Sequence, residues 1–156
     1  MPLTILPGDI FTSRAQTLVN PVNCQGAMGK GLARAFAIRY PAMFTAYRAY
    51  CVSGELRPGI LHLYTASSPW ILNFPTKVHW RRLSRLPYIV VGLEAFVAGY
   101  AGWGITSVAL PPLGCGLGGL AWSEVAPLLR QYLDQLPIAV EVYTDGIATT
   151  GPHRAP

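Results

Sequence analysis

Two glycine-rich segments constrain this fold most, because each lies between an apolar, strand-like run and a run with helical spacing. Loop 1 spans residues 23–31 and loop 2 spans residues 114–119. A glycine-rich turn that opens a helix leaves backbone N–H groups unpaired and pointing outward, in the positive field of the helix dipole. Two such turns in one small chain predict a site for an elongated anion, such as a diphosphate, held from both sides.

The remaining runs predict alternating strands and helices. The expected strands are 3–6, 17–22, 60–65, 70–74, 107–110 and 138–144. The expected helices are 30–39, 41–52, 85–100 and 124–136, the last two with Ser84 and Ser123 as N-caps. Such alternation is typical of an α/β sandwich around a largely parallel sheet. With 156 residues, about half of them hydrophobic, the chain is long enough to bury one core.

Charge is sparse and unevenly distributed along the chain. Twelve Lys and Arg against seven Asp and Glu leave a formal net charge of +5, which favours polyanionic partners only weakly. The basic segment, residues 77–85, holds four cations and no acid. Its tryptophan, Trp80, adds a base-stacking surface, so the segment is typical of single-stranded nucleic-acid binding. The alternative is a solvated helix start with a packed tryptophan.

Cysteine usage and the absence of targeting signals favour a cytoplasmic protein. Cys24, Cys51 and Cys115 are an odd set without the paired spacing of a zinc site, so we expect no metal. No stretch reaches the roughly 18 consecutive apolar residues that span a membrane. The first residues lack the basic region and cleavage site of a signal peptide. We therefore expect neither secretion nor membrane attachment.

Familiar nucleotide-binding motifs fit the two loops poorly. In loop 1, Lys30 is followed by Gly31 rather than Ser or Thr, so the magnesium ligand of a Walker loop is missing and an NTPase is excluded. Loop 2 matches the dinucleotide-binding spacing of glycines, and Glu141 lies about where that fold places its ribose-binding acid. However, one strand is expected after loop 2, whereas a dinucleotide fold needs several. The alternative for loop 1, a tight turn, needs one glycine rather than three.

Longer motifs make the resemblance more specific. Three of them are similar to the motifs of macrodomains: residues 8–10 (GDI), residues 22–24 (VNC) with 29–31 (GKG), and residues 112–120 (PLGCGLGGL). The resemblance covers residues 1–146 and implies a three-layer α/β/α domain that binds ADP-ribose, with a mixed, largely parallel sheet of about six strands. Residues 147–156 would be a tail or the start of a linker. Residues 73–80 (NFPTKVHW) resemble the DarG type, the DNA ADP-ribosylglycohydrolase antitoxin of DarT/DarG systems, related to animal terminal ADP-ribose protein glycohydrolase.

The resemblance implies roles along a bound ADP-ribose, without a separate cofactor or metal. Asp9 and Ile10 would meet the adenine, and Asn23 the distal ribose. Tyr143 would stack near adenine or the proximal ribose, unless it is a packing aromatic. The loops would enclose the distal ribose and diphosphate through Gly26, Ala27, Met28, Gly29, Lys30, Gly31, Pro112, Gly114, Cys115, Gly116, Leu117, Gly118 and Gly119. The expected DNA contacts are His79, Trp80, Arg81, Arg82 and Arg85.

Lys77 is the predicted catalytic residue. The chain has ten arginines and two lysines, and a lysine amine can lose its proton and attack carbon, whereas a guanidinium effectively cannot. In the family, this amine is proposed to attack the anomeric carbon of the distal ribose, and water then releases ADP-ribose. The attack needs a pKa lowered from about 10.4 to about 7, for which we expect burial beneath Trp80 and nearby arginines to act. The alternative is a lysine that only contacts phosphate.

One departure leaves the general acid unassigned. Gly118 stands where the animal relative has an aspartate that assists proton transfer, so loop 2 supplies no carboxylate. His79 can carry a proton near neutral pH. We expect a strand-like extension through His79.

The expected function is removal of ADP-ribose from a base of single-stranded DNA. The protein would act as the antitoxin to a DNA ADP-ribosyltransferase toxin, which a region outside this chain would contact. Two alternatives stay open: a module that binds ADP-ribose without turnover, and a hydrolase of ADP-ribosylated protein.

Overall fold

Six strands form one sheet in the computed structural model, which describes residues 2–145. They are β1 (Thr4–Leu6), β2 (Thr17–Val22), β3 (His62–Tyr64), β4 (Trp70–Pro75), β5 (Ser107–Leu110) and β6 (Ala139–Tyr143). Their order is β1-β6-β5-β2-β4-β3, and each neighbouring pair is parallel except β3 with β4. The prediction of a mixed, largely parallel sheet is confirmed. The predicted tail, residues 147–156, lies outside the described residues.

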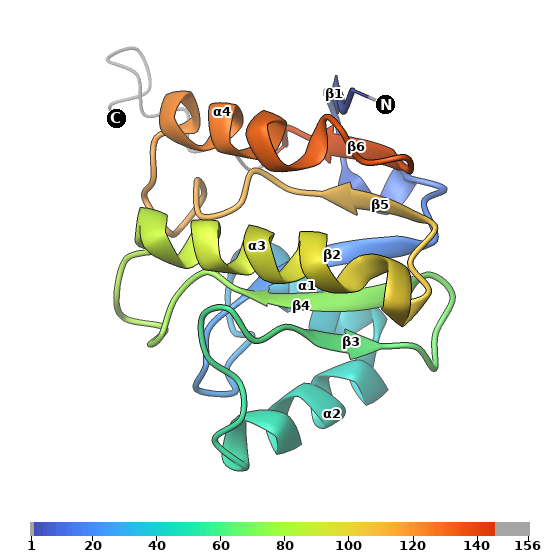
Figure 1. The fold of residues 1–156 in the computed structure, drawn as a ribbon. Helices are drawn as coiled ribbons and strands as arrows, with labels where there is room; N and C mark the ends of the chain where they lie inside the picture. The colour runs from blue at the N-terminus through green and yellow to red at the C-terminus, as the bar shows by residue number, and fades with distance from the viewer. Residues whose placement is uncertain (1, 146–156) are drawn as a thin grey trace.

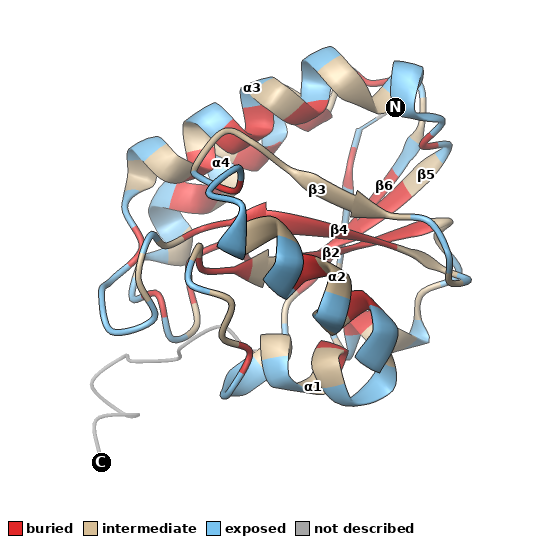
Figure 2. Ribbon diagram, turned by 90° about the horizontal axis from the view of Figure 1, so that it is seen from below, coloured by how far each residue is buried: buried red, intermediate tan, exposed pale blue. Residues whose placement is uncertain are grey.

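Helices cover both faces of this sheet (Figure 1). One face carries α1 (Gly31–Arg39) and α2 (Pro41–Val52), and the other carries α3 (Leu86–Trp103) and α4 (Trp122–Leu133). Neighbouring residues of a strand point to opposite faces. Leu18 and Ile71 therefore join the core under α1 and α2, while Val19 and Leu72 join the core under α3 and α4. Figure 2 shows the central strands as buried segments between helices, which confirms the three-layer α/β/α architecture.

Both predicted N-caps are wrong. Helix α3 begins at Leu86 after an extended Arg85, and Ser84 instead packs against loop 2, where its backbone N–H donates to the Gly118 carbonyl at 3.0 Å. Helix α4 begins at Trp122, one residue before Ser123, and the carbonyl of Ala121 accepts its first backbone hydrogen bonds. A tertiary contact thus engages the residue expected to cap α3, whereas α4 simply begins one residue earlier than expected.

The length and composition of helix α3 do not fit the expectation that no segment could span a membrane. Its 18 residues have a mean hydropathy of 1.3, which is long and apolar enough to cross a bilayer by length and composition alone. In the structure, Ile89, Leu93 and Phe96 of α3 are buried in the core. Gly92 lies so close to Phe74 that an added Cβ would be 2.2 Å from its ring. A core helix passes the same test, so this finding is weak evidence for a membrane span.

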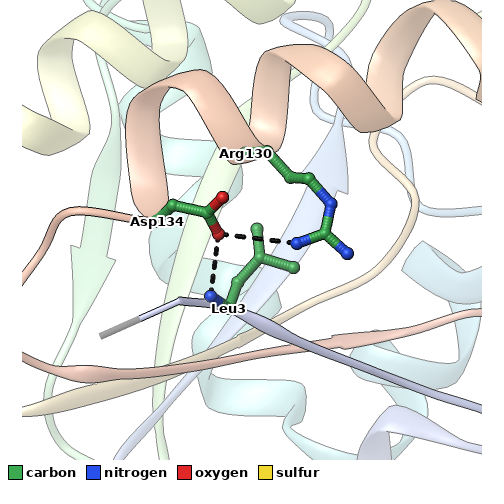
Figure 3. A network of polar contacts seen from close by, with 3 residues as sticks. All are labelled: Leu3, Arg130 and Asp134. Carbon is green, nitrogen blue, oxygen red and sulfur yellow. Dashed lines mark hydrogen bonds and ion pairs between the residues drawn. The ribbon is translucent and has the colours of Figure 1, made fainter.

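The edge strand β1 is tied to the end of α4. The backbone N–H of Leu3 donates to the Asp134 carboxylate at 2.9 Å (Figure 3). The same oxygen lies 3.6 Å from the Arg130 guanidinium, one helical turn earlier. These contacts hold β1 beside β6. After β1, the chain enters the site at Asp9.

A row of polar side chains runs from the centre of the sheet to its edge strand, β3. Asn20 of β2 faces Asn73 of β4, and its amide nitrogen donates to the Asn73 side-chain oxygen at 3.0 Å. The Asn73 amide nitrogen lies 3.0 Å from Nδ1 of His62, which pairs with Asn73 across β3 and β4. Since the amide is the donor here, His62 accepts and is uncharged. Burial lowers the pKa of His62, in agreement with this arrangement.

This row predicts a pH dependence of stability. The folded-state pKa of His62 lies below its unfolded value of about 6.5, so the unfolded chain binds the extra proton. Its contribution is fully present above about pH 6.5 and is lost as the pH falls through the folded-state pKa. Urea unfolding between pH 5 and 8 should show this loss, and His62→Gln should flatten it. An unchanged slope in the variant would show that other groups cause it.

Candidate functional site

A cleft of about 960 Å³ opens where the parallel strands end. Val22 ends β2, Thr76 follows β4, Pro111 follows β5 and Tyr143 ends β6, and all four line the cleft. This edge is where open α/β sheets bind ligands. The predicted site residues that line the cleft are Asp9, Ile10, Asn23, Ala27, Met28, Gly29, Lys30, Gly31, Lys77, Trp80, Arg81, Arg82, Pro112, Gly114, Gly116, Leu117, Gly118 and Tyr143.

Five predicted residues lie outside this lining. They are Gly26, His79, Arg85, Cys115 and Gly119. The lining also includes eight residues that the sequence analysis did not predict. They are Pro21, Val22, Leu32, Ala33, Thr76, Leu83, Pro111 and Asp145. Most of these residues directly precede or follow a predicted motif. Their places next to the predicted ends of strands could therefore have been used to predict them.

Loop 1 is organised around the side chain of Asn23. Its oxygen accepts from the backbone N–H of Gln25 at 2.9 Å, and its nitrogen donates to the Ala27 carbonyl at 2.8 Å. The buried Tyr47 hydroxyl donates to the Asn23 carbonyl at 2.7 Å. Asn23 thus shapes the loop through its side chain while it also borders the cleft.

Only two of the three loop 1 glycines use left-handed backbone conformations. Gly26 has a φ of 83° and Gly31 a φ of 60°, whereas Gly29 does not have a positive φ. Gly29 has no atom within 4 Å of an added Cβ. Its position therefore leaves open space beside the backbone at the cleft.

Loop 2 requires glycine at position 118. An added Cβ there would lie 2.2 Å from the Ser84 hydroxyl oxygen and 2.5 Å from the Gly114 carbonyl oxygen. The Ser84 hydroxyl is buried and has no hydrogen-bond partner among the residues described. The missing loop 2 carboxylate therefore has a structural cause, since no side chain fits at this position.

The two loops and Lys77 converge at Leu117. A methyl group of Leu117 lies 3.1 Å from where a Cβ of Gly31 would be, so loop 2 meets loop 1 there. The Lys77 amine donates to the Leu117 carbonyl at 3.4 Å. Burial lowers the pKa of Lys77, whereas the expected contribution of neighbouring arginines is not seen.

The basic segment turns back on itself at the cleft rim. The rings of His79 and Trp80 stack with centroids 5.5 Å apart, and the Arg81 guanidinium lies 4.6 Å from the Trp80 ring centre. The His79 carbonyl accepts from the backbone N–H of Arg82 at 2.9 Å. The predicted strand-like extension through His79 is therefore wrong, because this turn replaces it.

The end of the cleft beyond loop 1 is acidic. The Asp9 carboxylate accepts from the backbone N–H of Phe11 at 2.9 Å, and that of Asp145 accepts from the N–H of Gly8 at 3.2 Å. Tyr143 is buried beside them, and its hydroxyl donates to Glu141 at 3.0 Å. Glu141 does not line the cleft. Carboxylates at one end and cations in the rim suit a ligand with a donor-rich end and central phosphates.

Comparison with known proteins identifies the family. The model of the Macro domain matches residues 19–129, so the chain belongs to this family. It is 43% identical to the structure "Macrodomain of Mycobacterium tuberculosis DarG", with a TM-score of 0.87, covering 91% of this chain and 97% of the other. It is 41% identical to the structure "Thermosipho africanus DarTG in complex with ADP-ribose", with a TM-score of 0.85, covering 90% of this chain and 41% of the other.

Longer curated proteins are also similar. A DNA ADP-ribosyl glycohydrolase of Mycobacterium tuberculosis is 44% identical over 86% of this chain and 40% of its own length. A Thermosipho africanus DNA ADP-ribosyl transferase–DNA ADP-ribosyl glycohydrolase fusion is 40% identical over 90% of this chain and 41% of its own length. The chain thus spans about two fifths of these relatives.

The crowding at loop 2 predicts that Gly118→Ala destabilises the fold by about 1–3 kcal/mol, because the added methyl group must displace Ser84 or the Gly114 peptide. Gly29→Ala is the matched control in loop 1, where space is open and φ is not positive. Urea unfolding of both variants measures the difference. Equal midpoints for the two variants would contradict the packing argument.

Proposed function

We propose that this macrodomain hydrolyses the bond between ADP-ribose and a base of single-stranded DNA. The observation that carries the proposal is the Lys77 amine, 3.4 Å from the Leu117 carbonyl, in the cleft that both glycine loops line. The similarity to DNA ADP-ribosyl glycohydrolases supports the same reaction. In this proposal the protein reverses the modification made by a DNA ADP-ribosyltransferase toxin.

The proposed ligand, ADP-ribose, follows the polarity of the cleft. Its adenine lies by Asp9, Ile10 and Tyr143, its diphosphate lies between the two loops, and its distal ribose lies beneath Leu117. A cleft of about 960 Å³ has the size of a small-molecule site. Among residues 2–145, no three or more His, Cys, Asp or Glu gather in a way that could hold a metal ion. We propose a reaction in which ADP-ribose is the product and no separate cofactor takes part.

In the proposed chemistry, the uncharged amine of Lys77 attacks the anomeric carbon of the distal ribose. The carbon–nitrogen bond to the base breaks, its electron pair leaves with the base, and the base takes up a proton. Water then adds to the lysine-bound sugar, the carbon–nitrogen bond to Lys77 breaks, and ADP-ribose leaves with the amine restored. The lowered pKa of Lys77 supports this role, because attack requires the free amine.

The rim suits a nucleobase as the leaving group. Trp80, Leu83 and Leu117 are exposed apolar side chains at the mouth of the cleft, and Arg81 and Arg82 lie among them. An aromatic ring with neighbouring guanidinium groups stacks unpaired bases and contacts phosphates. A protein carboxylate ester needs no such surface. The rim therefore favours DNA over ADP-ribosylated protein.

The toxin contact and the cell compartment complete the proposal. The cognate toxin is contacted by a region outside this chain, and the fusion of the two named activities in a relative supports such a pairing. The protein works in the cytoplasm, where three unpaired cysteines remain reduced.

Substitution of Lys77 tests the reaction. Lys77→Ala and Lys77→Arg should each slow release of ADP-ribose from a modified single-stranded oligonucleotide by about 100-fold or more, since a guanidinium stays protonated. Chromatography of the released ADP-ribose measures the rate. Calorimetry with free ADP-ribose should show binding within about five-fold of the unsubstituted protein.

The outcomes separate the alternatives. Binding of ADP-ribose without release from DNA or protein would mean a non-catalytic binding module. Release from an ADP-ribosylated protein, but not from the oligonucleotide, would mean a protein hydrolase. Full activity of Lys77→Arg would overturn nucleophilic attack by the amine.

Salt dependence tests the DNA contacts of the rim. In a double logarithmic plot of affinity against salt, Arg81→Gln and Arg82→Gln should each reduce the slope by about 0.7, since each cation displaces counterions from single-stranded DNA. Arg57→Gln is the matched control, because Arg57 is exposed and lies outside the cleft lining. Fluorescence anisotropy of a labelled oligonucleotide measures the slopes. Unchanged slopes for both rim variants would place the DNA elsewhere.

A further inference from the structure

Cys24 contacts two consecutive peptide groups of the segment that carries Lys77. Its backbone N–H donates to the Val78 carbonyl at 3.1 Å. Its thiol donates to the Lys77 carbonyl, with sulfur and oxygen 3.4 Å apart. We propose that Cys24 is a positioning residue for Lys77, fixing the backbone from which the amine reaches the distal ribose. This inference rests on the function proposed above.

The Lys77 amine needs such a support because its own side chain does little to fix its position. A lysine side chain is long and flexible. Among residues 2–145, the amine of Lys77 makes one hydrogen bond, a long one of 3.4 Å to the Leu117 carbonyl. Before Lys77, the Thr76 N–H donates to the Val22 carbonyl at 2.9 Å, but the Lys77 N–H reaches the same oxygen only at 3.4 Å. The two contacts of Cys24 therefore hold the backbone where the β2–β4 ladder weakens.

Cys24 is itself rigidly placed. It follows Asn23, whose carbonyl and side-chain oxygen both lie within hydrogen-bond distance of the buried Tyr47 hydroxyl, at 2.7 and 3.0 Å. It also lies two residues before Gly26, where the part of loop 1 that would enclose the distal ribose begins. One residue thus sets the distance between the sugar and the amine that attacks it, and misplacement by about 1 Å can slow a reaction 100-fold.

The thiol has the protonation state that this contact requires. Burial, together with the neighbouring Cys51, raises the pKa of Cys24 to about 11. The thiol therefore keeps its hydrogen at neutral pH and can donate it to the Lys77 carbonyl. A thiolate would repel that oxygen, and a protonated thiol is a poor nucleophile. These properties suit a structural hydrogen-bond donor rather than a second reactive group.

Three variants test the positioning role. Cys24→Ala removes the donor, Cys24→Ser keeps one, and Cys51→Ala is the control, a neighbouring half-buried thiol. We expect Cys24→Ala to lower kcat for ADP-ribose release about ten-fold while KM stays within about two-fold. Cys24→Ser should stay within about three-fold of the unsubstituted protein, and Cys51→Ala should match it. Equal losses in both Cys24 variants, or none in Cys24→Ala, would overturn the proposal.

A second measurement does not depend on turnover. Reductive methylation by formaldehyde and cyanoborohydride, followed by peptide mass mapping, reports the pH at which Lys77 becomes reactive. The exposed Lys30, the other lysine of the chain, is the reference for reagent delivery. We expect the Lys77 midpoint to rise by about half a pH unit in Cys24→Ala as the amine moves into water, and to stay unchanged in Cys51→Ala.

The two measurements separate the two proposals. If the unsubstituted protein releases no ADP-ribose from any substrate, the proposed function fails, and the labelling still reports whether Cys24 positions the amine. If the midpoint of Lys77 is the same with and without the Cys24 thiol, the positioning role fails, whatever the activity.

Discussion

The pairing of β2 with β4 is the interaction on which the site depends. These two central strands run parallel over six residue pairs, from Thr17 opposite Trp70 to Val22 opposite Pro75. Loop 1 leaves the end of one strand and the basic segment leaves the end of the other. Because parallel neighbours end at the same edge, the pairing brings the two segments together. The ladder then continues beyond the strands through Thr76 and Cys24.

Loop 2 reaches the same place from β5 by close packing. The backbone of Gly118 lies against Ser84, and the added bulk of any side chain would separate the loop from the start of α3. This packing gives Leu117 its position over Gly31 and places its carbonyl before the Lys77 amine. The same crowding removes the option of a carboxylate in loop 2. In the proposed reaction, the lowered pKa of Lys77 and a nucleobase leaving group suit a site without that acid.

Motifs in the sequence predicted the cleft better than the contacts inside it. Eighteen predicted residues line it. The glycine-rich loops at strand ends are recognisable from spacing, whereas Asp9, Ile10 and Tyr143 followed from the resemblance to macrodomains. His79 and Arg85 do not line the cleft. The turn from His79 to Arg82 replaces the expected extension, and the backbone of Arg85 is extended just before α3. Ser84 looked like a helix cap because it precedes an apolar run, but a partner 34 residues later, Gly118, engages its backbone. Such a partner leaves no local signal.

The sequence by itself determined the alternation of strands and helices, the two glycine loops and the choice of Lys77 as the candidate nucleophile. These follow from apolar periodicity, backbone freedom and the chemistry of single side chains, which are local properties. Only the tertiary structure decided that Lys77 meets Leu117, 40 residues away, and that Cys24 holds the Lys77 backbone, 53 residues away. Those distances depend on strand order and on packing between layers, which arise only when the whole core is assembled.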